Sequence, residues 1–153
     1  MSETTVCVGT VVCRANEVLL VRQSAGHSLE GQWTIPWGQL GQGESPSAAA
    51  LRETEEEGGI VAEVEGLLGV QELPEPWLGM IGIVFLCRHT EGEPKPDNRE
   101  TDAATYFNRE ALEEVTGAIE PLSYWLVKRV LEDEHATITS DGSNPFCPSL
   151  GYF

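Results

Sequence analysis

The densest group of chemically active side chains in this sequence is a run of acids in the first half of the chain. If the run is helical, each residue advances about 100° around the axis, so the carboxylates of Glu53, Glu56 and Glu57 share one face. Arg52 lies four residues before Glu56 and can pair with its carboxylate, and Glu44 adds a further acid just before the helix. Converging carboxylate oxygens are ligands for hard cations such as Mg²⁺ or Mn²⁺. The spacing therefore predicts a metal site through which an acidic surface could accept a polyphosphate.

Local signals define the helix that must hold these acids. Ser45 is a suitable N-cap and Pro46 suits the first helical position. Residues 48–57 are mostly good helix formers, and Gly58-Gly59 would end the helix. The sequence thus predicts a helix that begins beside Glu44 and ends just after Glu57.

This helix also needs a face that packs against the rest of the protein. The helical spacing puts Ala48 and Leu51 opposite the acids, where they would pack on a sheet. Ala49 and Ala50 would flank the acidic face and leave room there for a ligand. A run of glutamates can also be only a solvated stripe, because like charges at these spacings repel each other. The glycine-rich loop before the helix favours a ligand site instead.

The rest of the chain predicts a mixed sheet with helices on both sides. Strands are predicted for the apolar or β-branched stretches 5–14, 17–23, 60–73, 78–88 and 105–107. Residues 24–43 predict an extended loop, and helices are predicted for residues 108–115 and from Pro121 to about Glu134. The expected fold class is α/β (α+β), a mixed β-sheet sandwiched between α-helices. We expect one domain over residues 1–153, with an unassigned C-terminal tail from about residue 135.

Composition excludes several classes of function. The chain has 9 Lys and Arg against 25 Asp and Glu, so its formal charge of −16 repels nucleic acid polymers and anionic lipid. No apolar run approaches the roughly 18–20 residues that cross a bilayer, and residues 1–5 do not resemble a signal peptide. The four cysteines form no CxxC pair, so a zinc site is not expected, and Cys7 and Cys13 are predicted to be buried thiols. We expect a cytoplasmic protein with no membrane partner.

The segment from Gly38 to Ile60 resembles the signature of the Nudix hydrolases. Gly38, Glu44, Arg52-Glu53 and Glu56-Glu57 stand at the offsets that this family keeps over 23 positions. The segments Trp33-Thr34-Ile35-Pro36 and Glu100 followed by Tyr106-Phe107 are also similar to recurrent family segments. Two positions depart from the usual pattern: Trp37 replaces a glycine, and Thr54 replaces a large apolar residue, which we expect to weaken helix packing slightly.

The resemblance implies a Nudix-type fold, a divalent cation and a set of roles. Glu56 and Glu57 would bind Mg²⁺ or Mn²⁺, with the Gly38 carbonyl as a further candidate ligand. Glu53 would be a ligand or the base that takes a proton from water, oriented by Arg52. Glu44 would be an outer-shell or second-metal ligand. Glu100 is the rival candidate for the base or an extra ligand, and its alternative is a surface loop acid. The catalytic candidates are therefore Arg52, Glu53, Glu57 and Glu100.

The same resemblance implies a small nucleotide substrate, either ADP-ribose-like or a (d)NTP, cleaved at its diphosphate linkage. Arg22 could bind a substrate phosphate or form only a surface ion pair. Trp37 could stack on a base, pack in the protein or face solvent, and Trp77 could line a pocket. Trp33 and Trp125 are expected in the core.

Other classes remain open at this stage. A catalytically inactive nucleotide-binding sensor on the same fold is the main alternative, followed by an isoprenoid diphosphate isomerase and an acidic interaction protein. A homodimer could use the apolar stretch 78–88 or the C-terminal aromatic residues Phe146, Tyr152 and Phe153. The tail could equally fold back over the pocket or the core.

Overall fold

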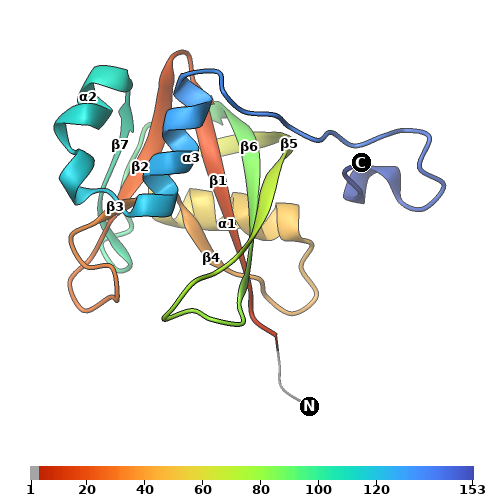
Figure 1. The fold of residues 1–153 in the computed structure, drawn as a ribbon, viewed down its shortest axis with the longest axis horizontal. Helices are drawn as coiled ribbons and strands as arrows, with labels where there is room; N and C mark the ends of the chain where they lie inside the picture. Colours follow the sequence, from red (N-terminus) through yellow and green to blue (C-terminus); the bar gives the residue numbers. More distant parts are fainter. Residues whose placement is uncertain (1–3) are drawn as a thin grey trace.

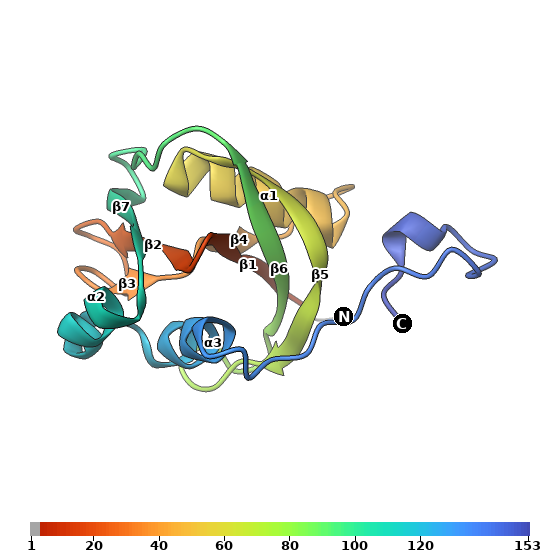
Figure 2. The same ribbon diagram turned by 90° about the horizontal axis from the view of Figure 1, so that it is seen from above.

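A computed structural model describes residues 4–153 of the chain. Its central layer is a mixed sheet, with α1 on one side and α3 on the other (Figures 1 and 2). The elements follow in this order: β1 (Val6–Arg14), β2 (Glu17–Gln23), β3 (Trp33–Thr34), β4 (Trp37–Gln39), α1 (Pro46–Gly58), β5 (Val61–Glu72), β6 (Ile81–Glu91), β7 (Thr101–Phe107), α2 (Arg109–Glu114), the 3₁₀ turn η1 (Thr116–Ala118), α3 (Pro121–Leu131) and the 3₁₀ turn η2 (Pro148–Leu150).

The main strand order of the sheet is β3-β2-β1-β6-β5, and the short strand β4 pairs with β1 outside this order. β1 runs parallel to β6, and the other strand pairs are antiparallel. β1 and β2 pair only beside their hairpin turn, at Cys13↔Val18 and Arg14↔Glu17. The two strands therefore separate toward the other end of β1, where β4 pairs with it through Gly9↔Trp37 and Val8↔Gly38.

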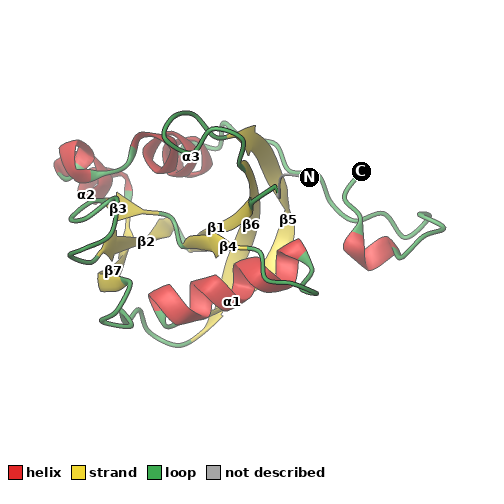
Figure 3. Ribbon diagram, turned by 90° about the horizontal axis from the view of Figure 1, so that it is seen from below, coloured by secondary structure: helices red, strands yellow, loops and turns green. Residues whose placement is uncertain are grey.

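Alternation along the strands produces two apolar cores, one on each face of the sheet. Val8 and Val12 of β1 pack with Ala49 and Ala50 of α1, whereas Val11 packs toward α2 and α3. Figure 3 shows α1 and α3 on opposite sides of the strands. The sheet thus holds α1 along its full length, and this fixes the position of the acids that α1 carries.

The predicted fold class is confirmed, and so are most of the elements. The prediction of a continuous loop over residues 24–43 is wrong, because this stretch contains β3 and β4. Their pairing with β2 and β1 defines these short strands, which have no apolar alternation of their own. β6 begins at Ile81 rather than Leu78, which is exposed, and β7 begins at Thr101 rather than residue 105.

Single residues also depart from expectation. Trp125 is 54% exposed rather than in the core, because it lies on the outer face of α3 beneath the guanidinium of Arg129. Trp33 does pack against the α3-side core, where its ring meets that of Phe107 edge to face. Cys7 is buried as expected, whereas Cys13 is only partly buried.

The C-terminal tail leaves α3 and extends beyond β5 (Figure 1). It contacts the body where the backbones of Ile138 and Leu67 exchange two hydrogen bonds, of 2.7 and 2.9 Å. Tyr152 packs on Phe85, with 5.5 Å between the ring centroids. The side chains of Phe146 and Phe153 are exposed.

The assignment of residues 1–153 to one domain stays a prediction.

Within residues 4–153, no helix combines the length and the apolar character that crossing a membrane requires.

Candidate active site

Helix α1 begins and ends where its local chemistry predicts. The Ser45 side chain accepts a hydrogen bond from the Ala48 N–H at 3.3 Å, and Pro46 occupies the first turn. At the other end, Gly59 adopts the left-handed conformation, with φ of 73°, and its N–H donates to the Glu55 carbonyl at 3.0 Å. The caps confirm the predicted helix.

The buried face of α1 differs from the predicted one. It consists of two rows of residues four apart, Ala49-Glu53-Glu57 and Ala50-Thr54-Gly58. Ala48 is exposed, whereas Ala49 and Ala50 are buried against the sheet, so the expected positions of these three alanines are wrong. Leu51 is partly buried against the α1-side core, as expected. Small side chains face the sheet because the helix lies very close to it. A Cβ at Gly58 would approach Leu19 Cδ2 to 2.9 Å.

Thr54 takes part in this close contact between α1 and the sheet, and it does not weaken the packing of the helix as expected. Its hydroxyl donates to the Ala50 carbonyl at 2.8 Å and lies 2.6 Å from the hydroxyl of Thr10 on β1. Both threonines are fully buried, and this pairing satisfies their polar groups. The departure from a large apolar residue is therefore matched by a specific contact with the sheet.

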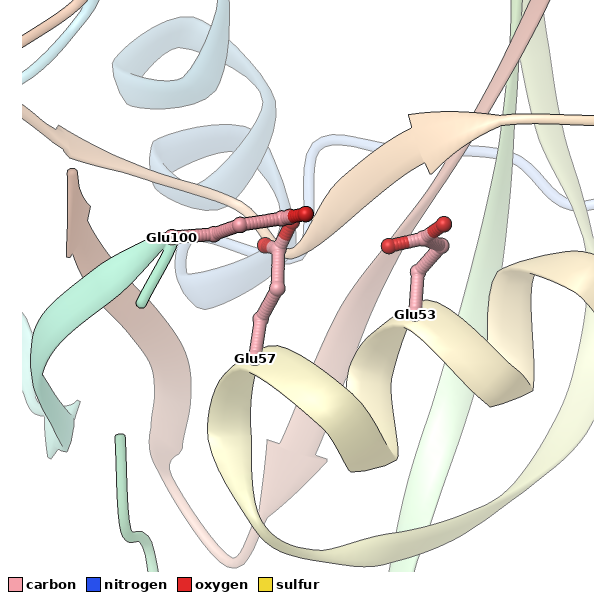
Figure 4. Close-up of side chains that lie close together, drawn as sticks. All are labelled: Glu53, Glu57 and Glu100. Atoms are coloured by element: carbon pink, nitrogen blue, oxygen red, sulfur yellow. The ribbon is translucent and has the colours of Figure 1, made fainter. Parts of the chain in front are cut away.

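Three carboxylates meet at the C-terminal half of α1, from two elements far apart in the chain. One oxygen from each of Glu53, Glu57 and Glu100 lies within 4.8 Å of the other two (Figure 4). Glu53 and Glu57 project from α1, and Glu100 directly precedes β7. Glu53 is 7% exposed and Glu57 only 2%, whereas Glu100 is exposed. We refer to these three residues as the acidic cluster.

Gly38 of β4 forms the wall that faces Glu53. A Cβ built on Gly38 would overlap the Glu53 carboxylate, so any larger residue would displace that side chain. The neighbouring Trp37 donates its backbone N–H to Glu57 Oε2 at 3.3 Å. The short strand β4 therefore packs its backbone directly against the two buried acids.

Among residues 4–153, no cationic side chain pairs with Glu57, the most buried member of the acidic cluster. Burial raises the pKa of Glu57 to about 9, and the charges of Glu53 and Glu100 add to the effect, while the Trp37 N–H opposes it. Burial also raises the pKa of Glu53, although Arg52 counteracts part of that rise. Three carboxylate oxygens converging on one another, with too little positive charge nearby, fit an oxygen-preferring divalent cation. The donor set does not fit a soft metal.

Arg52 ties the loop before α1 to the helix. Its Nε and Nη2 donate to both oxygens of Glu44, at 2.8 and 2.9 Å, and its Nη1 donates to Glu53 Oε1 at 2.9 Å. The hydrogen bonds from Arg52 lower the pKa of the Glu44 carboxyl, assisted by the Gly41 N–H. This bidentate contact holds Glu44 beside the site.

Glu56 does not join Glu53 and Glu57 on the buried face of α1. Its side chain is 52% exposed and lies 3.2 Å from Arg52 Nη1. Glu100 completes the acidic cluster in its place. The expectation that the three helix acids share one side is therefore correct only for Glu53 and Glu57, because residues four apart align on α1 more closely than residues three apart. The role of Glu56 as a metal ligand stays a prediction.

Arg22 lies away from the acidic cluster. Val21 faces α1, where it lies near Gly58, so its neighbour Arg22 projects from the opposite face of β2. Arg22 Nε pairs with Asp102 Oδ1 at 2.7 Å, and its guanidinium lies over the Trp33 ring. Contact of Arg22 with a substrate phosphate stays a prediction.

An apolar pocket of about 60 Å³ lies on the other side of β4. Because successive strand residues point to opposite faces, the Trp37 side chain lines this pocket while Gly38 faces Glu53. The rings of Trp37 and Trp77 meet edge to face, with centroids 6.4 Å apart. Other lining residues include Cys7, Leu73, Ile83 and Leu122. The sequence indicated Trp37 and Trp77, but it gave no signal for the others, which come from three separate elements and a loop.

The chain was compared with protein-family models, curated proteins and solved structures. A family model described as "NUDIX domain" matches residues 3–135. The 8-oxo-dGDP phosphatase NUDT18 of Homo sapiens is 35% identical over 111 residues, which cover 70% of this chain and 33% of that protein. An ADP-ribose pyrophosphatase of Methanocaldococcus jannaschii is 31% identical over 100 residues, covering 64% of this chain and 59% of that one.

A solved structure agrees with these matches. The crystal structure of a NUDIX hydrolase from Nitrosomonas europaea superposes with a TM-score of 0.77 at 25% identity, covering 87% of this chain and 73% of that one. The chain spans about a third or less of the length of several of the curated relatives that it matches.

Proposed function

The chain belongs to the Nudix family, and we propose that it hydrolyses the diphosphate linkage of a small nucleoside diphosphate derivative with the help of a divalent cation. The observation that carries this proposal is the acidic cluster of Glu53, Glu57 and Glu100, three converging carboxylates with little compensating charge. Nudix hydrolases generally depend on divalent metal, and this donor set suits Mg²⁺ or Mn²⁺.

Each charged residue of the site has a part in the proposal. Glu53, Glu57 and Glu100 would hold the cation, with Glu44 and Glu56 as outer or second-ion ligands and the Gly38 carbonyl as a further ligand. The cation, when bound, supplies charge neutralisation for the phosphates and acidifies water. Arg52 favours the ionised form of Glu53 and orients its carboxylate through the 2.9 Å hydrogen bond to Oε1.

The proton acceptor is proposed from the same residues. Glu100 is the exposed member of the acidic cluster, so its carboxylate is open to water and to a bound substrate. Glu53 is the other candidate, because Arg52 fixes its orientation. A variant at each position separates the two: loss of the base lowers kcat more than it lowers cation affinity.

The pocket beside Trp37 supports a nucleotide with an aromatic base. Trp37 connects the two sites, since its backbone N–H contacts Glu57 and its side chain lines the apolar pocket. A base that packs against the Trp37–Trp77 pair would gain contacts with its aromatic and apolar surface. Relatives named for 8-oxo-dGDP, ADP-ribose and 8-oxo-dGTP support a purine nucleotide, either ADP-ribose-like or a (d)NTP.

A nucleotide panel tests the proposal. ADP-ribose, dGTP, 8-oxo-dGTP and 8-oxo-dGDP are incubated with the protein in Mg²⁺ or in EDTA, and the products are identified by mass. We expect cleavage of at least one nucleotide in Mg²⁺ only, and a loss of roughly a hundredfold or more in kcat for Glu57→Gln. Glu55→Gln is the matched control, because Glu55 lies exposed on the same helix outside the acidic cluster.

Two outcomes would contradict the proposal. Binding of nucleotide without turnover under every metal condition would favour the inactive sensor. Equal rates of nucleotide cleavage in Mg²⁺ and in EDTA would show that cleavage does not need a cation at the acidic cluster. A cytoplasmic location and a homodimer are further parts of the proposal. Gel filtration with light scattering tests for the homodimer.

A further inference from the structure

The segment that delivers Glu100 to the acidic cluster is anchored on the C-terminal end of α1. The backbone N–H of Lys95 donates to the Gly58 carbonyl at 2.8 Å, and the Thr101 hydroxyl donates to the Glu57 carbonyl at 2.8 Å. The last carbonyls of a helix lack partners within the helix, so these contacts satisfy them. Residues 95–101 are thereby fixed to the same turn of α1 that carries Glu57.

Asp97 organises the interior of this segment. Its Oδ1 accepts hydrogen bonds from the backbone N–H groups of Arg99 at 2.9 Å, Glu100 at 2.9 Å and Thr101 at 3.0 Å. Burial alone would raise the pKa of Asp97, but these N–H groups outweigh it and lower the pKa. Asn98 takes a φ of 58°, a left-handed conformation that asparagine tolerates in turns. One carboxylate oxygen thus holds three consecutive N–H groups.

Glu100 depends on this turn because its side chain has no other support. Its N–H is held by Asp97, and its carbonyl accepts from the Ser24 N–H at 2.9 Å. Within residues 4–153, the Glu100 carboxylate forms neither a hydrogen bond nor an ion pair with another group. It nevertheless lies beside the Glu57 carboxylate, and Figure 4 shows it reaching across from the start of β7. The direction of the side chain is therefore set by the backbone that Asp97 holds.

We propose that Asp97 is a positioning residue that presents Glu100 to the acidic cluster and thereby completes the cation site. The inference rests on the proposed function, since it assumes that Glu100 contributes to cation binding. Asp97 Oδ1 contacts the backbone N–H groups of the turn, and the negative charge of Asp97 also acts on Glu57. Asp97→Asn keeps an acceptor for the turn and removes that charge, so it separates the two effects. Removal of the acceptor frees three N–H groups, and the turn then no longer specifies where the Glu100 carboxylate lies.

A double-mutant cycle on Mn²⁺ affinity tests this role. Free Mn²⁺ is measured by electron paramagnetic resonance during titration of the full chain, Asp97→Ala, Glu100→Gln and the double variant, each first shown to be folded by circular dichroism. Asp97→Asn tests for rescue, because the asparagine oxygen can accept the same three bonds. Asp141→Ala is the matched control: Asp141 accepts from the Ser143 N–H and hydroxyl at 2.8 and 2.7 Å in the distant tail.

We expect Asp97→Ala and Glu100→Gln each to weaken Mn²⁺ binding roughly tenfold, the size of effect typical for residues that orient metal ligands. The double variant should bind within about twofold of Glu100→Gln, because two residues acting through one contact are not additive. Asp97→Asn and Asp141→Ala should bind within about twofold of the unmodified chain, by the same standard for uncoupled sites.

Several results would overturn the role of Asp97. Asp97→Ala with unchanged affinity would do so, as would a further tenfold loss when Asp97→Ala is added to Glu100→Gln. Failure of Asp97→Asn to rescue would show that the charge, rather than the turn, matters. If the unmodified chain binds no Mn²⁺ at millimolar concentration, the proposed function fails first, and the role of Asp97 falls with it.

Discussion

Replacing Glu57 with glutamine should stabilise the metal-free protein, and the gain should grow as the pH rises. Glu57 is 2% exposed and its pKa is raised from 4.5 to about 9, first by burial and then by the neighbouring acids. A carboxyl whose pKa is higher in the folded than in the unfolded state contributes its full stability below pH 4.5. That stability is lost progressively as the pH rises toward 9. Glutamine keeps the shape and an acceptor for the Trp37 N–H but has no proton to lose.

The magnitude follows from the size of the pKa difference. Each pH unit in this window costs the folded state about 1.4 kcal/mol, so the penalty grows by about 2–3 kcal/mol between pH 5 and pH 7. For a chain of this size, 1 kcal/mol moves the melting temperature by about 2–4 °C. Glu57→Gln should therefore melt about 5–10 °C above the unmodified chain at pH 7 in EDTA, and at a similar temperature at pH 5.

Thermal unfolding by circular dichroism at several pH values, in EDTA and in Mg²⁺, measures this directly. Mg²⁺ should raise the melting temperature of the unmodified chain and leave that of Glu57→Gln nearly unchanged. Glu55→Gln, which removes an exposed carboxylate from the same helix, is the matched control. Parallel melting curves for Glu57→Gln and the unmodified chain across pH 5–7 would refute the reasoning.

Further predictions concern the surroundings of the acidic cluster. Gly38→Ala should weaken Mg²⁺ binding by roughly tenfold or more in calorimetric titration, because its Cβ overlaps the Glu53 carboxylate, while Gly117→Ala, with open space around it, should not. Thr54→Val should cost about 1–3 kcal/mol in urea unfolding, since it leaves a buried hydroxyl unpaired, and cation affinity should stay the same. Trp77→Ala should raise the KM of the preferred nucleotide roughly tenfold with a smaller change in kcat, and the reverse split would argue against base stacking.

Features with a local cause were predictable from the sequence. The bounds of α1 follow from the side chain of Ser45, the ring of Pro46 and the left-handed conformation of Gly59, all of which act within one turn. The mixed sheet follows from strand periodicity and from the lack of regular alternation between strands and helices. The closeness of Glu53 and Glu57 follows from their spacing of four residues on a helix.

Features that depend on distant partners were not predictable in the same way. β4 exists because it pairs with β1, and Glu100 joins the acidic cluster because residues 95–101 bind the end of α1. The buried face of α1 was mistaken because the acids were expected on the side of the helix opposite the sheet, whereas the close approach to the sheet selects small residues and encloses two acids. Asp97 could have been suspected from its turn sequence, since Asp-Asn pairs favour turns, but its link to Glu100 requires the fold.

The central claim is that Glu53, Glu57 and Glu100 hold one divalent cation between them. A crystal structure with Mn²⁺, with the ion located by its anomalous scattering, tests the claim most directly. We predict an anomalous peak enclosed by the three carboxylates, at about 2.0–2.3 Å from their nearest oxygens, and its absence in crystals of Glu57→Gln. A peak elsewhere on the acidic surface, with these three side chains taking no part, would contradict it.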